Sequence, residues 1–222
     1  MAVYERSWRR YAGALTPLKG RFLVVTRYAL GDVFASRIFT AFYALCFLPS
    51  VLGLLFIYLS HNVPLLNQLG APPDLMKVLT SQFFMVLFSW QALPAFLVAV
   101  LVSPSLIAAD LSNNALPLYL ARPITRAEYV LGKTAVLALL LSPMTWVMGL
   151  ATFALQASLE GGGWWVNNYQ IGVAYLVGHL TWIVVISMLT LAISAWVRYK
   201  PVARGALFAI IFILAGFATA VN

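Results

Sequence analysis

Charged residues and cysteine are scarce in this sequence. Only 9% of its 222 residues are charged, whereas 63% are hydrophobic. A soluble domain of this length cannot bury so much apolar surface, because surface-to-volume scaling leaves a large part of it exposed. The single cysteine, Cys46, lies in an apolar run, which excludes a disulfide framework and a cysteine metal site. The composition predicts an all-α, polytopic helical membrane protein.

Residues suited to catalysis are also few. The chain has two histidines, His61 on a predicted outer loop and His179 inside an apolar segment. No acidic residue lies inside an apolar segment, so no Ser/His pair, carboxylate pair or His cluster converges on a nucleophile or a metal. The sequence therefore favours a chain that is not itself an enzyme. An intramembrane enzyme is kept as an alternative.

Five apolar segments reach or approach the roughly 20 residues that a helix needs to cross a bilayer. They are residues 39–59, 83–102, 135–157, 171–197 and 205–221. Every Lys and Arg except Lys77 lies before the first segment, between the second and third, or between the fourth and fifth. By the positive-inside rule these parts, and the N-terminus, are cytoplasmic. We therefore expect a multi-pass protein of the plasma (inner) membrane, whose basic charge meets membrane lipids and not nucleic acid.

We interpret residues 1–222 as one transmembrane domain. A cytoplasmic segment covers residues 1–38, and a cytoplasmic loop covers residues 103–134. Residues 18–37 mix apolar and charged side chains, a pattern that suits a helix lying in the membrane interface. An equal alternative is a cytoplasmic extension of the first span.

The loop between the second and third spans contains a helix signal. Ser103-Pro104 is typical of a helix start, with Ser as the N-cap and Pro at the first helical position. The predicted helix ends at Asn113-Asn114. A helix of about ten residues is marginal by itself in water, so it needs a surface to lie on. The membrane is one candidate for that surface, and a partner protein is the other.

A basic stretch then leads into the third span. Arg122-Pro123 ends any preceding helix. Thr125 to Glu128 has the pattern of a capping box, with Thr125 as the N-cap. Lys133 is expected at the lipid headgroup level, with its stem along the apolar surface. Residues 132–134 resemble the end of a phosphate-binding loop, but no strand precedes them and Ala127 stands where that loop needs Gly, so no nucleotide site is predicted.

Polar side chains inside the bilayer are candidates for function, because they are costly there. Gln91 and His179 each lie about 12 Å in from the outer end of their spans. We expect them to face one cavity and contact substrate. An interhelical hydrogen bond that holds the bundle together is the alternative. Pro49, Pro94 and Pro143 fall near mid-membrane, where they can kink helices and free backbone carbonyls.

Three stretches carry a resemblance to a known family. The central one runs from Ile107 to Lys133, and its most specific part, from Leu118 on, contains Leu-Tyr-Leu-Ala-Arg-Pro-Ile-Thr-Arg and then Glu-Tyr-Val-Leu-Gly-Lys. Polar residues at 26–37 and 194–204 lead into the first and fifth spans. Together they resemble the type-2 permease family, the membrane subunits of ATP-binding-cassette (ABC) exporters. Members of that family usually have six spans, so the resemblance leads us to expect a further span after Asn222.

The resemblance implies partners and a mechanism. Cytoplasmic ABC ATPase subunits would bind ATP and Mg²⁺, this chain would bind no cofactor, and a second copy or a homologous permease would complete the complex. A coupling helix between the second and third spans would contact the ATPase and drive export of a hydrophobic or amphiphilic substrate. A non-transporting scaffold or sensor driven by an ATPase is a further alternative. The residues assigned to coupling are Leu106, Ile107, Asp110, Asn113, Arg122, Pro123 and Arg126.

We expect charge to set the register of this contact. Asp110 and the pair Arg122 and Arg126 are the groups that would do so. The alternative for each is a charge that faces solvent or lipid.

Overall fold

The computed structural model describes residues 20–62, 81–121, 124–197 and 199–221. All regular elements in these ranges are helices. In chain order they are α1 (Arg21–Phe34), α2 (Arg37–Leu45), α3 (Leu48–Ser60), α5 (Ser81–Leu106), α6 (Ala108–Ser112), α7 (Leu116–Leu120), α8 (Arg126–Ser142), a π-helical turn (Pro143–Val147), α9 (Met148–Glu160), α10 (Gly162–Trp196) and α11 (Lys200–Val221).

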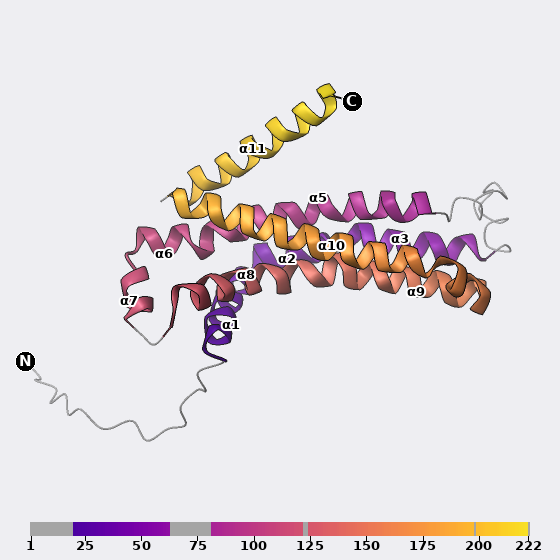
Figure 1. The fold of residues 1–222 in the computed structure, drawn as a ribbon, viewed down its shortest axis with the longest axis horizontal. Coiled ribbons are helices and arrows are strands. Elements are labelled where there is room, and N and C mark those ends of the chain that lie inside the picture. Colours follow the sequence, from indigo (N-terminus) through magenta and orange to yellow (C-terminus); the bar gives the residue numbers. More distant parts are fainter. Residues whose placement is uncertain (1–19, 63–80, 122–123, 198, 222) are drawn as a thin grey trace, which may run out of the picture.

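Four helical stretches of the described chain are long and apolar enough to cross a membrane. They are Arg37–Ser60, Ser81–Ser112, Arg126–Glu160 and Gly162–Trp196. They lie side by side in one bundle (Figure 1), as the first four apolar segments predicted. The fifth segment falls in α11, which is not among these four and projects away from the bundle along most of its length (Figure 1).

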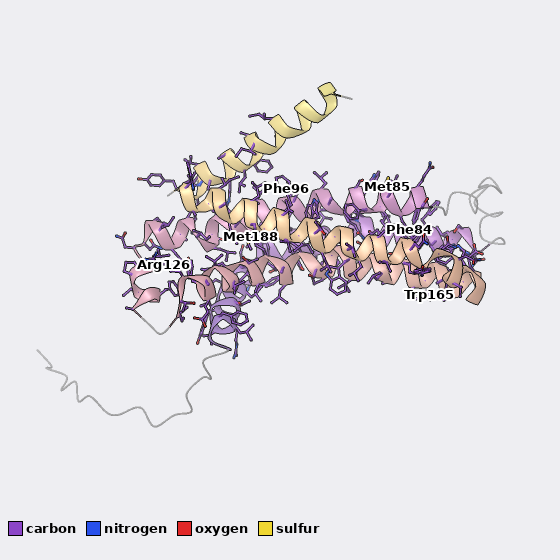
Figure 2. All side chains as sticks on the ribbon, viewed as in Figure 1. Phe84, Met85, Phe96, Arg126, Trp165 and Met188 are labelled. Carbon is purple, nitrogen blue, oxygen red and sulfur yellow. The ribbon has the colours of Figure 1, made fainter. Side chains whose placement is uncertain are left out.

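The core of the bundle is apolar, and so is its surface. Val98 of α5, Leu137 of α8 and Ile183 of α10 belong to one buried cluster. Met85 and Trp165, by contrast, are exposed on the outside of the bundle (Figure 2). An apolar surface of this extent is expected where lipid replaces water as the solvent.

The predicted helix start at Ser103-Pro104 is wrong. Helix α5 continues through both residues to Leu106, and the break comes at Ile107. Ser103 is buried, and its hydroxyl lies 3.2 Å from that of Ser194 on α10, so packing between the two helices holds the chain helical. Proline is tolerated inside a membrane helix when neighbouring helices support it.

Two short helices replace the single predicted one. Helices α6 and α7 are joined by a turn in which Asn114 has a φ of 50°, a left-handed conformation that Asn adopts more readily than most residues. We call residues 107–121 the elbow. Because only Ile107 separates α6 from α5, the elbow is attached closely to the end of that span.

The N-terminal region forms a helix of its own. Ser36 has an extended backbone and its side chain accepts a hydrogen bond from the N–H of Phe39, so α1 ends before α2 begins. The interpretation of residues 18–37 as a simple extension of the first span is therefore wrong. Helix α1 crosses α8, where the Thr26 hydroxyl donates to the Gly132 carbonyl at 2.9 Å. A Cβ on Gly132 would lie 3.0 Å from the Phe22 carbonyl oxygen, so any larger residue would force this crossing slightly apart.

The three mid-membrane prolines have different surroundings. Pro49 follows a break between α2 and α3, and Pro143 opens the π-helical turn. Pro94 lies inside the continuous helix α5.

Only Gly161, with a φ of 95°, separates α9 from α10, so α10 begins well before the predicted start at residue 171.

Candidate functional site

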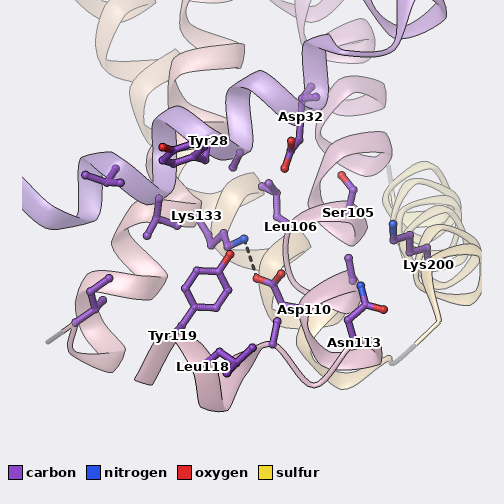
Figure 3. Close-up of a pocket in the computed structure, with 17 residues that line it drawn as sticks. Tyr28, Asp32, Ser105, Leu106, Asp110, Asn113, Leu118, Tyr119, Lys133 and Lys200 are labelled. Carbon is purple, nitrogen blue, oxygen red and sulfur yellow. Dashed lines mark ion pairs between the residues drawn. The ribbon is translucent and has the colours of Figure 1, made fainter. Parts of the chain in front are cut away.

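A cavity of about 670 Å³ lies at the end of the bundle where α8 and α11 begin. We call this the basic end, because Lys133 and Lys200 stand there. Helix α1, the end of α5, the elbow and the first turns of α8 surround the cavity, and Lys200 reaches it from α11 (Figure 3). Among the described residues, the cavity therefore lies between α1, the elbow and the basic ends of α5, α8 and α11.

A buried ion pair forms one wall of the cavity. Lys133 Nζ lies 2.8 Å from Asp110 Oδ2, and the side chain of Lys133 is only 5% exposed. The Tyr129 hydroxyl donates to the same carboxylate oxygen at 2.7 Å. The rings of Tyr119 and Tyr129 also lie 5.7 and 5.4 Å from the ammonium group, within range of a cation–π contact. The pair joins the elbow to α8.

The start of α8 is fixed by its own sequence. The Thr125 side chain accepts a hydrogen bond from the Glu128 N–H at 3.2 Å, and the Glu128 carboxylate accepts one from the Thr125 N–H at 2.7 Å. The predicted capping box is confirmed. Tyr129 and Lys133 are four residues apart in the helix that this cap begins, so they lie on the same face of α8.

A second polar cluster lies within the bundle. Gln91 Nε2 donates to the Ser50 hydroxyl at 2.7 Å, and the Tyr175 hydroxyl donates to the side-chain oxygen of Gln91. Ser50 in turn donates to the carbonyl of Met144, in the π-helical turn, at 3.4 Å. His179 Nδ1 lies 3.2 Å from the Tyr175 carbonyl, so this nitrogen carries the hydrogen. We call Ser50, Gln91, Tyr175 and His179 the polar network.

The polar network is closely packed. Gln91 and His179 are 1% and 0% exposed. A Cβ on Gly149 would lie 1.8 Å from Cε1 of Tyr175, so the tyrosine ring occupies the space that any other residue at position 149 would need. Neither Gln91 nor His179 lines the cavity at the basic end. The hydrogen bonds of Gln91 to Ser50 and Tyr175 have the geometry of the interhelical bonds that the sequence left as an alternative. His179 bonds within α10 and contacts α5 through the ring of Phe88.

The comparisons with known proteins give the family. A family model described as ABC-2 family transporter protein matches residues 36–222. The chain belongs to the ABC-2 transporter family. No curated protein and no solved structure matches it. ABC-2 proteins are membrane subunits that act with an ABC ATPase in general, and the apolar helices agree with a multi-pass member of this kind.

The residues assigned to coupling have different places in this ABC-2 protein. Leu106 and Ile107 are buried, and Asp110 is paired with Lys133. Asn113 and Arg126 are exposed. Arg122 and Pro123 lie outside the described residues. The assigned residues therefore divide into an inner set, which packs, and an outer set, which is accessible.

Lys133 and its aromatic neighbours were not among the residues assigned to the site. Lys133 was expected to extend to the headgroup level, which is wrong, since its ammonium turns inward to Asp110. The sequence did contain a signal for this site: Tyr129 and Lys133 are four residues apart, which places them on one face of the predicted helix. The position of Asp110 opposite that face depends on how the elbow folds, and the sequence pattern did not reveal it.

Proposed function

We propose that this chain is the permease subunit of an ATP-driven ABC exporter of the plasma (inner) membrane. The basic end is cytoplasmic, as is the N-terminus. The elbow contacts a separate ATPase subunit, which binds ATP and Mg²⁺. A second copy of the chain or a homologous permease completes the transporter, and the substrate is hydrophobic or amphiphilic.

The Asp110–Lys133 pair is the observation that carries this proposal. A short segment passes on motion only if it is attached to what must move. The elbow follows α5 directly, and the ion pair attaches it to α8, so a push on the elbow moves the basic ends of two spans together. Helix α1 packs on the same part of α8 through Thr26 and Gly132 and moves with it. ATPase closure would then tilt these helices as one body.

The accessible side of the elbow supplies the docking surface in this proposal. Leu118 of α7 is 71% exposed, and Asn113 and Arg126 are exposed nearby in the sequence. Leu106 and Ile107 are buried behind them and support the elbow from within. Asp110 acts in the same way, as a positioning residue that holds the elbow through Lys133.

Co-purification tests the docking surface. Leu118→Asp places a charge at the exposed tip of the elbow and should reduce the amount of ATPase that is recovered with the chain in mild detergent. Leu159→Asp is the matched control, because Leu159 is an exposed leucine at the opposite end of the bundle. Equal recovery of the ATPase with both variants would contradict docking at the elbow.

Coupling is tested separately from docking. Replacing Asp110 by Asn together with Lys133 by Met removes both charges and leaves no unpaired ion. The proposal expects the ATPase to stay bound while transport per ATP hydrolysed falls. Loss of ATPase binding and transport in parallel would show that the pair serves docking alone.

A substrate pathway past Gln91 and His179 remains part of the proposal. Both side chains now have protein partners, so they reach substrate only if the polar network opens during transport. Alanine at each position tests this. Unchanged transport at normal expression would remove the two residues as substrate contacts and leave them a role in holding the helices together.

A further inference from the structure

The cavity at the basic end contains two charges of opposite sign with no partner in the described chain. Asp110 and Lys133 neutralise each other at 2.8 Å. Asp32 of α1 and Lys200 of α11 also line the cavity and reach it from different sides (Figure 3). Among the described residues neither of these two has an ion-pair or hydrogen-bond partner. The cavity therefore offers one carboxylate that can pair with a cation and one ammonium group that can pair with an anion.

An apolar surface continues from the rim of this cavity. Val24 and Tyr28 of α1 line the cavity and are 40% and 73% exposed. Leu23 is exposed beside them on the same helix. Lys200 is the first residue of α11 and lies at the end of the bundle, where lipid headgroups are found if the four long helices cross a bilayer. A molecule with a zwitterionic head and an apolar tail would match the unpaired carboxylate, the unpaired ammonium and the exposed apolar surface.

We infer that this cavity binds a phospholipid with a phosphoethanolamine headgroup. Lys200 contacts the phosphate, and the Asp32 carboxylate accepts hydrogen bonds from the primary ammonium. The acyl chains lie along the exposed apolar face of α1. This inference requires the chain to lie in a membrane, but it does not require the elbow to bind an ATPase.

The chemistry of the cavity distinguishes this headgroup from two common alternatives. An anionic headgroup without an amine would leave Asp32 unpaired and close to a second negative charge. A choline headgroup has no N–H to donate to Asp32 and is usually recognised by aromatic rings. The Tyr119 ring is already in contact range of Lys133, which leaves a single ring, Tyr28, for a quaternary ammonium among the described residues that line the cavity.

Native mass spectrometry of the whole protein tests the inference. The chain, with any subunits that accompany it, is purified in mild detergent and mixed with equal amounts of phosphatidylethanolamine, phosphatidylcholine and phosphatidylglycerol. We expect phosphatidylethanolamine to be retained about fivefold more than each of the others, the effect of one exposed ionic contact. Equal retention of the three lipids, or a preference for phosphatidylglycerol, would overturn the inference.

Matched variants assign the preference to the cavity. Asp32→Asn should abolish the preference for phosphatidylethanolamine over phosphatidylcholine, and Lys200→Gln should lower the retention of all three lipids. Glu160→Gln and Arg37→Gln remove an acid and a base outside the cavity and should change neither result. A preference that survives in Asp32→Asn overturns the inference. Loss of ATPase recovery in this variant, with lipid retention unchanged, would show that a protein segment fills the cavity instead.

A measurement on the unaltered chain does not depend on how the variants fold. Adding one, two or three methyl groups to the ethanolamine nitrogen removes its N–H donors in steps. Retention should fall with each step and be lowest for the trimethylated lipid. Constant retention across this series would contradict a role for Asp32 as the acceptor.

Discussion

The basic end and the polar network both bury polar side chains, yet only one of them surrounds free space. The polar network is closed around Tyr175, whose ring fills the space beside Gly149. The basic end surrounds about 670 Å³ and keeps Asp32 and Lys200 without partners in the described chain. The polar network thus joins helices within the bundle, whereas the basic end leaves room for a ligand.

Breaking the ion pair at the basic end should have the largest effect. Asp110→Ala leaves the buried Lys133 ammonium without its carboxylate, which should lower the free energy of unfolding by about 3–5 kcal/mol. Thermal unfolding in detergent measures this loss. Asp110→Leu combined with Lys133→Met removes both charges and should recover most of the stability. A double variant as unstable as the single one would contradict the pairing.

Crowding the polar network should have the next largest effect. Gly149→Ala places a methyl group at a position 1.8 Å from Tyr175 Cε1, so the ring must move and the cost should be about 1–3 kcal/mol. The same thermal unfolding assay applies. Gly163→Ala is the control, because a Cβ there meets nothing within 4 Å. The comparison fails if both variants unfold at the same temperature.

Removing the cap of α8 should have a smaller and more local effect. Thr125→Ala leaves the Glu128 N–H without its acceptor and should cost about 1 kcal/mol. Hydrogen exchange should rise in the first turn of α8, at the basic end, and stay unchanged near Tyr175. Thr134→Ala, a threonine one turn beyond Val130, serves as the control. Faster exchange throughout the bundle would show that the cap acts beyond the basic end.

The hydrogen bond between Tyr175 and Gln91 should contribute least. Hydrogen bonds between membrane helices average about 0.6 kcal/mol in double-mutant cycles. Tyr175→Phe and Gln91→Leu, made separately and together, measure this coupling directly. A coupling energy indistinguishable from zero would remove the bond as a reason for keeping Gln91 in the bundle.

Local signals in the sequence predicted much of the fold. The first four apolar segments became the four membrane-directed helices, and the capping box at Thr125 formed as expected. The prediction failed at Ser103-Pro104, where a strong local start signal was overridden by the packing of Ser103 against α10. Such a signal shows only that a helix is able to begin there.

The site was harder to predict than the fold. Asp110 was assigned to coupling for its charge, but its partner Lys133 was placed at the headgroups. Gln91 and His179 were expected around a cavity, and the structure places them around Tyr175, a residue that no pattern had singled out. Pairings of this kind depend on the rotation of each helix about its axis. A segment that is apolar on all sides does not indicate which face turns inward.

The sequence by itself determined that this chain belongs in a membrane, the order of its first four spans and the start of α8. These features follow from composition, apolar length and the chemistry of neighbouring residues, all of which act locally. Only the tertiary structure decided that Asp110 meets Lys133, that α1 crosses α8 at Gly132, and that a cavity remains between them. These contacts join residues far apart in the chain, and they form only when helix packing has fixed which face each helix turns inward.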